Sequence, residues 1–342
     1  MRSSSSHTSP KRTSRLGLGL LVLLGALVLS FTFSIFFGSN MGSPAQTWEA
    51  IIHPSNSETS VIVWSLRMPR TILGIVVGVA YGVAGALIQA ITRNPLADTG
   101  ILGVNAGAGF AVTIGVGIFG VAGNNSMMLW AMGGALLATG AVYIIGGMGE
   151  SGASPATLVL AGVALGALLG GVSSALVLLD PDTFERIRRW GLGTIVTVNY
   201  HDVLQLGPYI VVALGIAAAI AHSLNAAALG DDLAITLGAR LIRTRILGII
   251  AVTILAGSAT AITGGLSFVG LMIPHIVRWF TGPDQRWILA YSALAAPSLV
   301  LSSDVIGRLI AWPGEIEVGI ITAALGAPLL IALVRRRKVS TL

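Results

Sequence analysis

The sequence has no cysteine and only two lysines, Lys11 and Lys338, among its 342 residues. Without cysteine the chain can form neither disulfide bonds nor thiolate metal sites. A P-loop needs the lysine of Gly-x-x-x-x-Gly-Lys-Ser/Thr to hold nucleotide phosphates, and neither lysine lies in that context. The chain therefore has no P-loop of its own for ATP hydrolysis, and we expect no cofactor on it.

Charge is scarce as well. Charged residues make up 10% of the chain, hydrophobic residues make up 54%, and 44 glycines are spread through the apolar runs. This composition is typical of a membrane protein. Because backbone polar groups in lipid must be bonded within the chain, and because strand alternation is absent, the apolar runs predict helices. The expected fold class is an all-α polytopic membrane protein.

The apolar runs predict ten transmembrane helices, since a span needs about 20 mostly apolar residues. The run over 246–282 is too long for one span, so we expect two spans that meet at Gly264 and Gly265. The ten spans lie near residues 16–37, 70–92, 99–121, 126–147, 155–179, 203–222, 246–264, 266–282, 287–311 and 317–334.

The distribution of basic residues sets the expected orientation. Cytoplasmic loops of membrane proteins collect Lys and Arg. With both termini inside, 14 of the 20 basic residues fall on the cytoplasmic side. We therefore predict an N-in and C-in topology. The polar residues 1–15 are expected to form a basic, disordered tail, and residues 16–338 a single membrane domain.

Few ionisable residues lie inside the predicted spans or flank their outer ends. Asp304 lies within a span, and Arg308 follows four residues later on the same helix face, so the two are expected to form a structural ion pair. A proton relay through Asp304 is the alternative. Arg67, Arg70 and Arg308 fall at the outer side, where they are either ordinary flanking charges or ligands for the carboxylates of a partner. The histidines show no metal-ligand spacing, so we expect no metal.

The loop over 223–245 is polar but carries a leucine every four residues: Leu229, Leu233, Leu237 and Leu241. This pattern predicts short amphipathic helices outside the bilayer. The leucines either pack on neighbouring loops or form a docking surface for a partner, and the pattern alone leaves both readings open.

Five blocks of sequence resemble the FecCD family of permeases, and the match covers nearly the whole chain after the first span. The blocks are LRMPRTILGIVVGVAYGVAGALIQAITRNPLADTGILGVNAGAG from Leu66, LAGVALG from Leu160, RRWGLG around Trp190, GLSFVGLMIPHIVRWFTGPDQR from Gly265, and the stretch from Asp304 to LGAP at 325–328. The resemblance implies a ten-helix permease with the type II fold of ATP-binding-cassette (ABC) importers in the cell membrane. It implies import of an iron-siderophore or related metal chelate, with haem and cobalamin as alternatives.

The resemblance also implies partners and site residues. Partners are an identical or homologous permease, two ABC ATPase subunits that use ATP, an extracytoplasmic binding protein and the lipid bilayer. The binding protein is expected to dock on Arg67, Arg70 and Arg308. The ATPase is expected to dock on a coupling segment over 224–242, through Leu233, Leu237, Gly238, Ala239 and Arg240. The expected gating residues are Gly147, Gly149, Glu150, Ser151 and Trp190.

One departure from the family pattern and two rival functions remain open. Glu317 replaces a usual proline, and it adds an outer carboxylate that could pair with Arg308. An ion-coupled secondary transporter would need Asp304 to titrate during transport. A membrane-embedded assembly subunit would have no substrate pathway.

Overall fold

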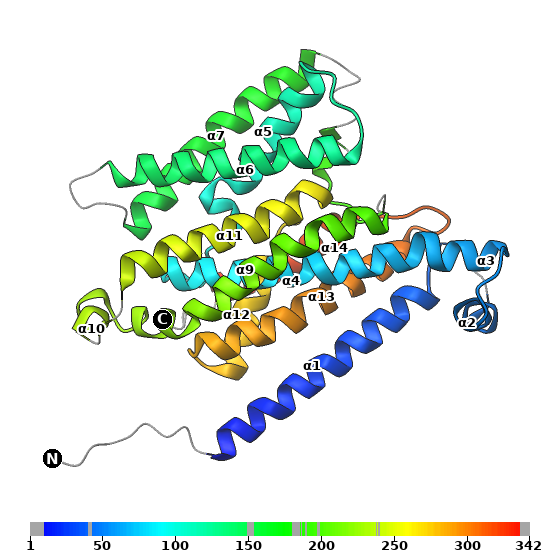
Figure 1. Ribbon diagram of the computed structural model, residues 1–342, viewed down its shortest axis with the longest axis horizontal. Coiled ribbons are helices and arrows are strands. Elements are labelled where there is room, and N and C mark those ends of the chain that lie inside the picture. The colour runs from blue at the N-terminus through cyan, green and yellow to red at the C-terminus, as the bar shows by residue number, and fades with distance from the viewer. Residues whose placement is uncertain are drawn as a thin grey trace.

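The computed structural model describes residues 10–39, 43–148, 154–179, 185, 187, 188, 190–196, 199–236, 238 and 240–335. Within these residues the secondary structure is entirely helical, which agrees with the predicted fold class. Figure 1 shows long helices lying side by side as inclined rods.

Seven helices are long and apolar enough to cross a membrane in the part of the chain that the structure describes. They are α1 (Pro10–Phe36), α4 (Met68–Thr92) with the turns before it, α6 (Asn124–Gly147), α7 (Pro155–Leu179), α9 (Tyr200–Ala227), α11 (Leu241–Thr263) and α13 (Gln285–Ile310). Three shorter helices occupy the remaining predicted spans: α5 (Val104–Gly117), α12 (Val269–Thr281) and α14 (Val318–Arg335).

Two predicted boundaries are wrong. The first helix begins at Pro10, so residues 10–15 are helical and do not belong to a disordered tail; residues 1–9 lie outside the described residues. The expected span over 99–121 is split into a 3₁₀ helix, η2 (Thr99–Leu102), and α5, because Gly103 between them adopts φ +72°. A positive φ cannot continue a right-handed helix, and glycine adopts it without steric cost.

The predicted break inside 246–282 is present. α11 ends at Thr263, and Gly264 follows with φ +70°. A side chain at Gly264 would overlap the carbonyl oxygen of Trp190, so this position needs glycine for packing as well as for conformation. The extended segment from Gly264 to Ser267 then leads into α12.

The central helix is α4, and at two of its glycines it lies directly against the backbone of α13. A side chain at Gly78 would overlap the backbone of Pro297, and one at Gly82 would overlap the carbonyl oxygen of Ser292. Small residues at four-residue spacing allow helices to approach in this way. Another series at the same spacing, Gly162, Gly166 and Gly170 of α7, behaves differently: Gly162 packs on the Ile101 carbonyl, but Gly170 faces open space.

Short helices mark the two ends of the bundle. α10 (Asp231–Thr236) lies at the end where α1 begins, on the left in Figure 1. At the opposite end lie α2 (Pro44–Ile52) and α3 (Glu58–Val61), and α3 continues through a π-helical turn, η1 (Ile62–Arg67), into α4. We call these the α10 end and the α2 end.

Candidate functional site

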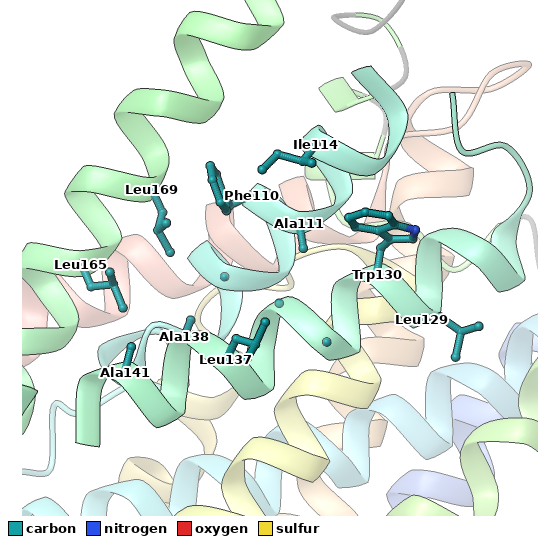
Figure 2. Close-up of a pocket in the computed structure, with 13 residues that line it drawn as sticks. Phe110, Ala111, Ile114, Leu129, Trp130, Leu137, Ala138, Ala141, Leu165 and Leu169 are labelled. Carbon is teal, nitrogen blue, oxygen red and sulfur yellow. The ribbon is translucent and has the colours of Figure 1, made fainter. Parts of the chain in front are cut away.

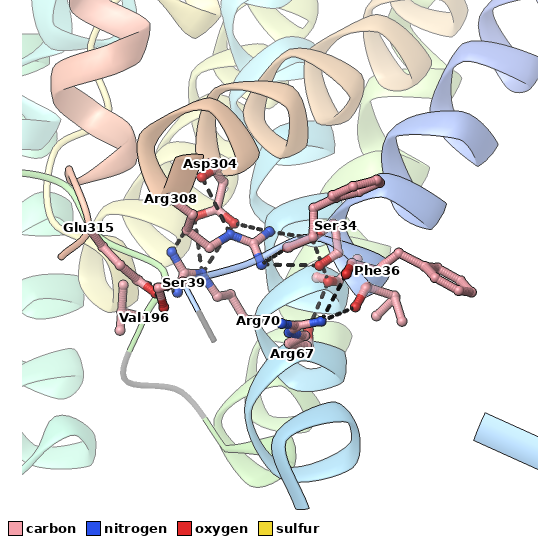
Figure 3. Close-up of polar contacts among 12 residues, drawn as sticks. Ser34, Phe36, Ser39, Arg67, Arg70, Val196, Asp304, Arg308 and Glu315 are labelled. Carbon is pink, nitrogen blue, oxygen red and sulfur yellow. Dashed lines mark hydrogen bonds and ion pairs between the residues drawn. The ribbon is translucent and has the colours of Figure 1, made fainter. Parts of the chain in front are cut away.

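The predicted outer arginines lie together at the α2 end, where they form a charge cluster with two carboxylates (Figure 3). This outer charge cluster consists of Arg67, Arg70, Asp304, Arg308 and Glu315. Arg67 is the last residue of η1, and Arg70 lies on the first turn of α4. Asp304 and Arg308 lie on α13, and Glu315 lies in the loop before α14.

Arg70 joins the two carboxylates. Its Nε donates to Asp304 Oδ1 at 3.0 Å, and its Nη2 donates to the same oxygen at 2.6 Å. Its Nη1 donates to Glu315 Oε2 at 2.7 Å. A guanidinium is suited to this role, because its planar fork of N–H groups can serve two carboxylates at once. Arg70 therefore ties α4 both to α13 and to the loop that follows α13.

Arg308 forms the ion pair expected with Asp304, at 2.9 Å between Nη2 and Oδ2. It also reaches the end of α1: Nη1 donates to the carbonyl oxygens of Phe37 at 2.8 Å and Ser34 at 3.1 Å. The last carbonyls of a helix have no partner within the helix and carry partial negative charge. Arg308 therefore caps α1 while it neutralises Asp304.

Arg67 caps the same helix end. Its Nη1 donates to the carbonyl oxygens of Ile35 at 2.8 Å and Phe36 at 3.2 Å (Figure 3). The sequence had suggested outer arginines that face a partner, but Arg67, Arg70 and Arg308 are only 6%, 7% and 2% exposed. In this structure the three guanidinium groups serve internal contacts. Sequence reasoning missed the capping of α1 and the Arg70–Glu315 pair, because neither partner is a sequence neighbour.

Glu315 is the member of the cluster nearest the surface, with 27% of its side chain exposed. Burial alone would raise the pKa of this carboxyl group, but the Arg70 charge and the hydrogen bonds from Arg70 and Ser39 hold the pKa below its usual value. Ser39 Oγ donates to Glu315 Oε1 at 2.8 Å. Glu315 is therefore charged at neutral pH.

Glu317 makes no ion pair with Arg308 among the described residues, where Asp304 is the partner of Arg308. Its Oε2 is buried and has no hydrogen-bond partner in the described part of the chain.

The α10 end carries the predicted coupling segment, and here the leucine pattern does not form one stripe. Leu229 and Leu233 are exposed, whereas Leu241 is buried at the start of α11. Ala234 holds α10 in place: it is fully buried and packs with Ala227 and Leu241. Leu237 and Ala239 lie outside the described residues.

The exposed residues at the α10 end form an apolar surface. Leu229, Leu233 and Ile235 are each more than half exposed. A groove of about 520 Å³ adjoins them, lined by Ile235 and by residues 240–243, 246 and 247. Gly238 makes the turn with φ +80°, and Arg240 precedes α11. Exposed apolar patches rimmed by charge are typical of interaction surfaces.

The expected gating residues are only partly described. Gly147 is the exposed last residue of α6, and Gly149, Glu150 and Ser151 lie outside the described residues. Trp190 is half-buried against the backbone of Gly264, and its indole Nε1 is buried without a hydrogen-bond partner among the described residues. Thr194, after it, donates its backbone N–H to the Thr263 carbonyl at 2.7 Å. The segment around Trp190 is thus anchored to the break between α11 and α12.

A groove that the sequence did not predict lies between α5, α6 and α7 (Figure 2). Its volume is about 540 Å³, and its walls are apolar, with Phe110 and Trp130 as the largest side chains. Gly107 and Gly134 allow α5 and α6 to touch beneath it. The described residues contain no group of three His, Cys, Asp or Glu side chains that could hold a metal ion. None of the residues that line the groove is a His, Cys, Asp or Glu that could bind a metal ion directly.

Comparison with known proteins gives consistent matches over almost the full length. The model of the FecCD transport family matches residues 26–336. The ferric enterobactin transport system permease protein FepD of Escherichia coli (strain K12) is 43% identical over 319 residues, which are 93% of this chain and 94% of that protein. The cobalamin import system permease protein BtuC of Halobacterium salinarum is 36% identical, over 94% of this chain and 88% of that protein.

A solved structure has the same fold. It is described as an inward-facing conformation of a metal-chelate type ABC transporter, and it superposes with a TM-score of 0.82 at 26% identity. The superposition covers 94% of this chain and 99% of that chain.

Proposed function

The chain belongs to the FecCD transport family, and from that premise we propose that it is the permease subunit of an ABC importer for iron-siderophore chelates. The observation that carries this proposal is the match of the family model over residues 26–336, which include nine of the ten predicted spans in full. The 43% identity to a ferric enterobactin permease favours a siderophore as the cargo. Haem or cobalamin, carried in the same way, is the alternative.

The permease is not itself an enzyme. Its two lysines lie outside any P-loop pattern, so ATP must be bound and hydrolysed by separate subunits. Two ABC ATPases would serve a pair of permeases, and one of them would dock on the coupling segment at the α10 end of each chain. The exposed side chains of Leu229, Leu233 and Ile235 support this assignment, because an apolar surface outside the bilayer is costly unless a partner covers it. Leu237, Gly238, Ala239 and Arg240 complete the proposed contact.

The proposed topology has ten transmembrane helices and both termini in the cytoplasm. This places the α10 end inside, next to the ATPases, and the α2 end outside. Two permease chains would pair around a central pathway. We place the second chain against α7, which is the least buried of the seven long apolar helices. Gly147, Gly149, Glu150 and Ser151 would form the inner gate, and Trp190 the outer one.

A binding protein would dock at the α2 end over the outer charge cluster. The cluster holds three arginines and two carboxylates, so its net formal charge is +1. An excess positive charge at a surface attracts a partner that presents carboxylates. Because the arginines are buried, we propose that docking first displaces the Glu315 side chain, which is the more exposed of the two carboxylate partners of Arg70.

An ion-coupled transporter is the second candidate from a different class. It would require Asp304 to gain and lose a proton during transport. The guanidinium groups of Arg70 and Arg308 both bond Asp304 and hold it between α4 and α13. The geometry therefore favours a structural role for Asp304.

Docking can be tested on the importer assembled with its ATPase and binding protein. We expect Arg67→Gln to raise the binding-protein concentration that gives half-maximal stimulation of ATPase activity. The maximal stimulation should stay near that of the wild type. The matched control is Arg188→Gln, because Arg188 is also an outer arginine but is exposed, and its ion pair among the described residues is with nearby Glu185 at 2.8 Å. An Arg67 variant that matches the Arg188 variant at every concentration would contradict the docking proposal.

A further inference from the structure

One side chain ties the end of α9 to the start of α13. Asn225 Nδ2 donates to Asp284 Oδ1 at 2.8 Å, and Asn225 Oδ1 accepts the backbone N–H of Gln285 at 2.7 Å. One turn earlier on α9, the ring of His222 contacts the guanidinium of Arg286. Asp284 is the N-cap of α13 and accepts the Arg286 N–H at 3.0 Å. Asn225 therefore completes the N-terminal cap of α13 from another helix.

The same turn of α9 carries the coupling segment. Ala226 and Ala227, next to Asn225, pack with Ala234 of α10 and with Leu241 of α11. Two backbone hydrogen bonds continue this connection, from Gly230 N–H to the Ala227 carbonyl and from Ala234 N–H to the Gly230 carbonyl. A displacement of α10 would therefore act first on the turn that holds the start of α13.

The far end of α13 carries the outer charge cluster. The helix has 26 residues and is therefore about 39 Å long, enough to cross the membrane in one piece. On the face that packs against α4, the backbone of α13 lies directly against Gly78 and Gly82. Close-packed contacts of this kind have low compressibility, so they can transmit a displacement of one helix to the other. Asp304 and Arg308, near its C-terminus, bond Arg70 of α4 and the end of α1.

We propose that Asn225 and Asp284 form a mechanical joint that passes movement of the coupling segment to α13, and through α13 to the binding-protein surface. This inference rests on the proposed function, since it assumes an ATPase on α10 and a binding protein at the α2 end. Within it, Asn225 is a positioning residue: it touches neither nucleotide nor cargo. The alternative is that these hydrogen bonds only stabilise the fold. In that case their loss would lower stability without changing the amount of chelate taken up per ATP hydrolysed.

The hydrogen bonds allow a swap test. In Asn225→Asp, two carboxylates would face each other, so the bond to residue 284 is lost. Asp284→Asn alone should be nearly silent, because the asparagine oxygen can still cap α13 and accept from Asn225. In the double variant, Asn225→Asp with Asp284→Asn, the new amide at 284 donates to the new carboxylate at 225. Both hydrogen bonds between α9 and α13 are then restored, the one to residue 284 with its direction reversed. The amide nitrogen takes the place of the oxygen that accepted the Arg286 N–H, so only this cap bond within α13 is lost.

The measurement is chelate taken up per ATP hydrolysed by the assembled importer in vesicles, with a ferric siderophore as cargo. We expect Asn225→Asp to lower this ratio by about five-fold or more, the scale of a typical coupling between two sites. Asp284→Asn and the double variant should lie within two-fold of the wild type, by that same scale. The control is Gln205→Ala, because Gln205 lies near the other end of α9 and its side chain bonds, within the part of the chain that the structure describes, His201 of its own helix.

Two outcomes would overturn the proposal. A normal ratio in Asn225→Asp would overturn the joint, and so would a low ratio that the double variant does not restore. If Asn225→Asp fails to assemble with the ATPase, Asn225→Ala, which removes the bonds without adding charge, takes its place with the same expected loss. If the wild-type importer shows no ATP-dependent uptake at all, it is the proposed function that fails.

Discussion

At the scale of single residues, the outer charge cluster shows how charge is kept inside a largely apolar protein. An isolated buried charge is very costly, so each guanidinium is placed against carboxylates or against the partial charges of a helix end. Asp304 is the central partner, since Arg70 and Arg308 both bond it. A buried pair of this kind is expensive to break, because the charge that remains cannot be solvated.

The first prediction concerns Asp304. Asp304→Asn should destabilise the protein by about 3–5 kcal/mol, because Arg70 and Arg308 would lose their shared counter-charge. Thermal unfolding in detergent measures the loss. Glu49→Gln, which removes an exposed carboxylate of α2, is the control and should leave the unfolding temperature unchanged. Equal unfolding temperatures for the two variants would contradict the assigned role.

The second prediction concerns pH. The pKa of Glu315 is lowered in the folded protein, so its charged form contributes stability above its unfolded pKa of about 4.5 and loses it as the pH falls through the folded pKa. The difference in stability between the wild type and Glu315→Gln should therefore be constant from pH 8 to about pH 5 and shrink below pH 4.5. Unfolding followed across this range tests it, and a difference that persists unchanged at pH 3 would be inconsistent with the Arg70–Glu315 pair.

At the scale of elements, the closest contact is between α4 and α13. Gly78→Ala should destabilise the protein by about 1–3 kcal/mol, since the added methyl group would meet the Pro297 backbone, which cannot move aside. Gly170→Ala on α7 is the matched control, because nothing lies near that position. Because alanine is favoured over glycine in a helix, Gly170→Ala should raise the free energy of unfolding by up to about 1 kcal/mol. Equal effects of the two substitutions on unfolding temperature would show that α4 and α13 are not in backbone contact.

The elements were largely predictable from the sequence, and the site was predictable only in part. Long apolar runs mark the helices, and Gly264 marks the break after α11, because these signals are local. η2 was missed, since only the positive φ of Gly103 separates it from α5. The ion pair between Asp304 and Arg308 follows from helical spacing. The caps that Arg67 and Arg308 make on α1 depend on how distant helices pack, and helical periodicity does not carry that information.

At the scale of the whole molecule, the proposed orientation predicts which surface faces which compartment. The chain has no cysteine, so a single introduced cysteine is the only thiol that can react and no native cysteine has to be replaced first. We expect Asn56→Cys, in the exposed loop before α3, to react with a membrane-impermeant maleimide in intact cells. Thr236→Cys, at the exposed end of α10, should react only after the membrane is opened. The reverse pattern would invert the topology and place the coupling segment outside.

The central claim is that this chain is a permease powered by ATP on other subunits. The most direct measurement is uptake of radioactive iron as a ferric siderophore into vesicles that hold the permease and its ATPase, with the binding protein outside. The account predicts uptake that requires enclosed ATP, requires the binding protein and survives a protonophore. Uptake that proceeds without ATP and collapses with the protonophore would contradict it and would assign the chain to ion-coupled transport.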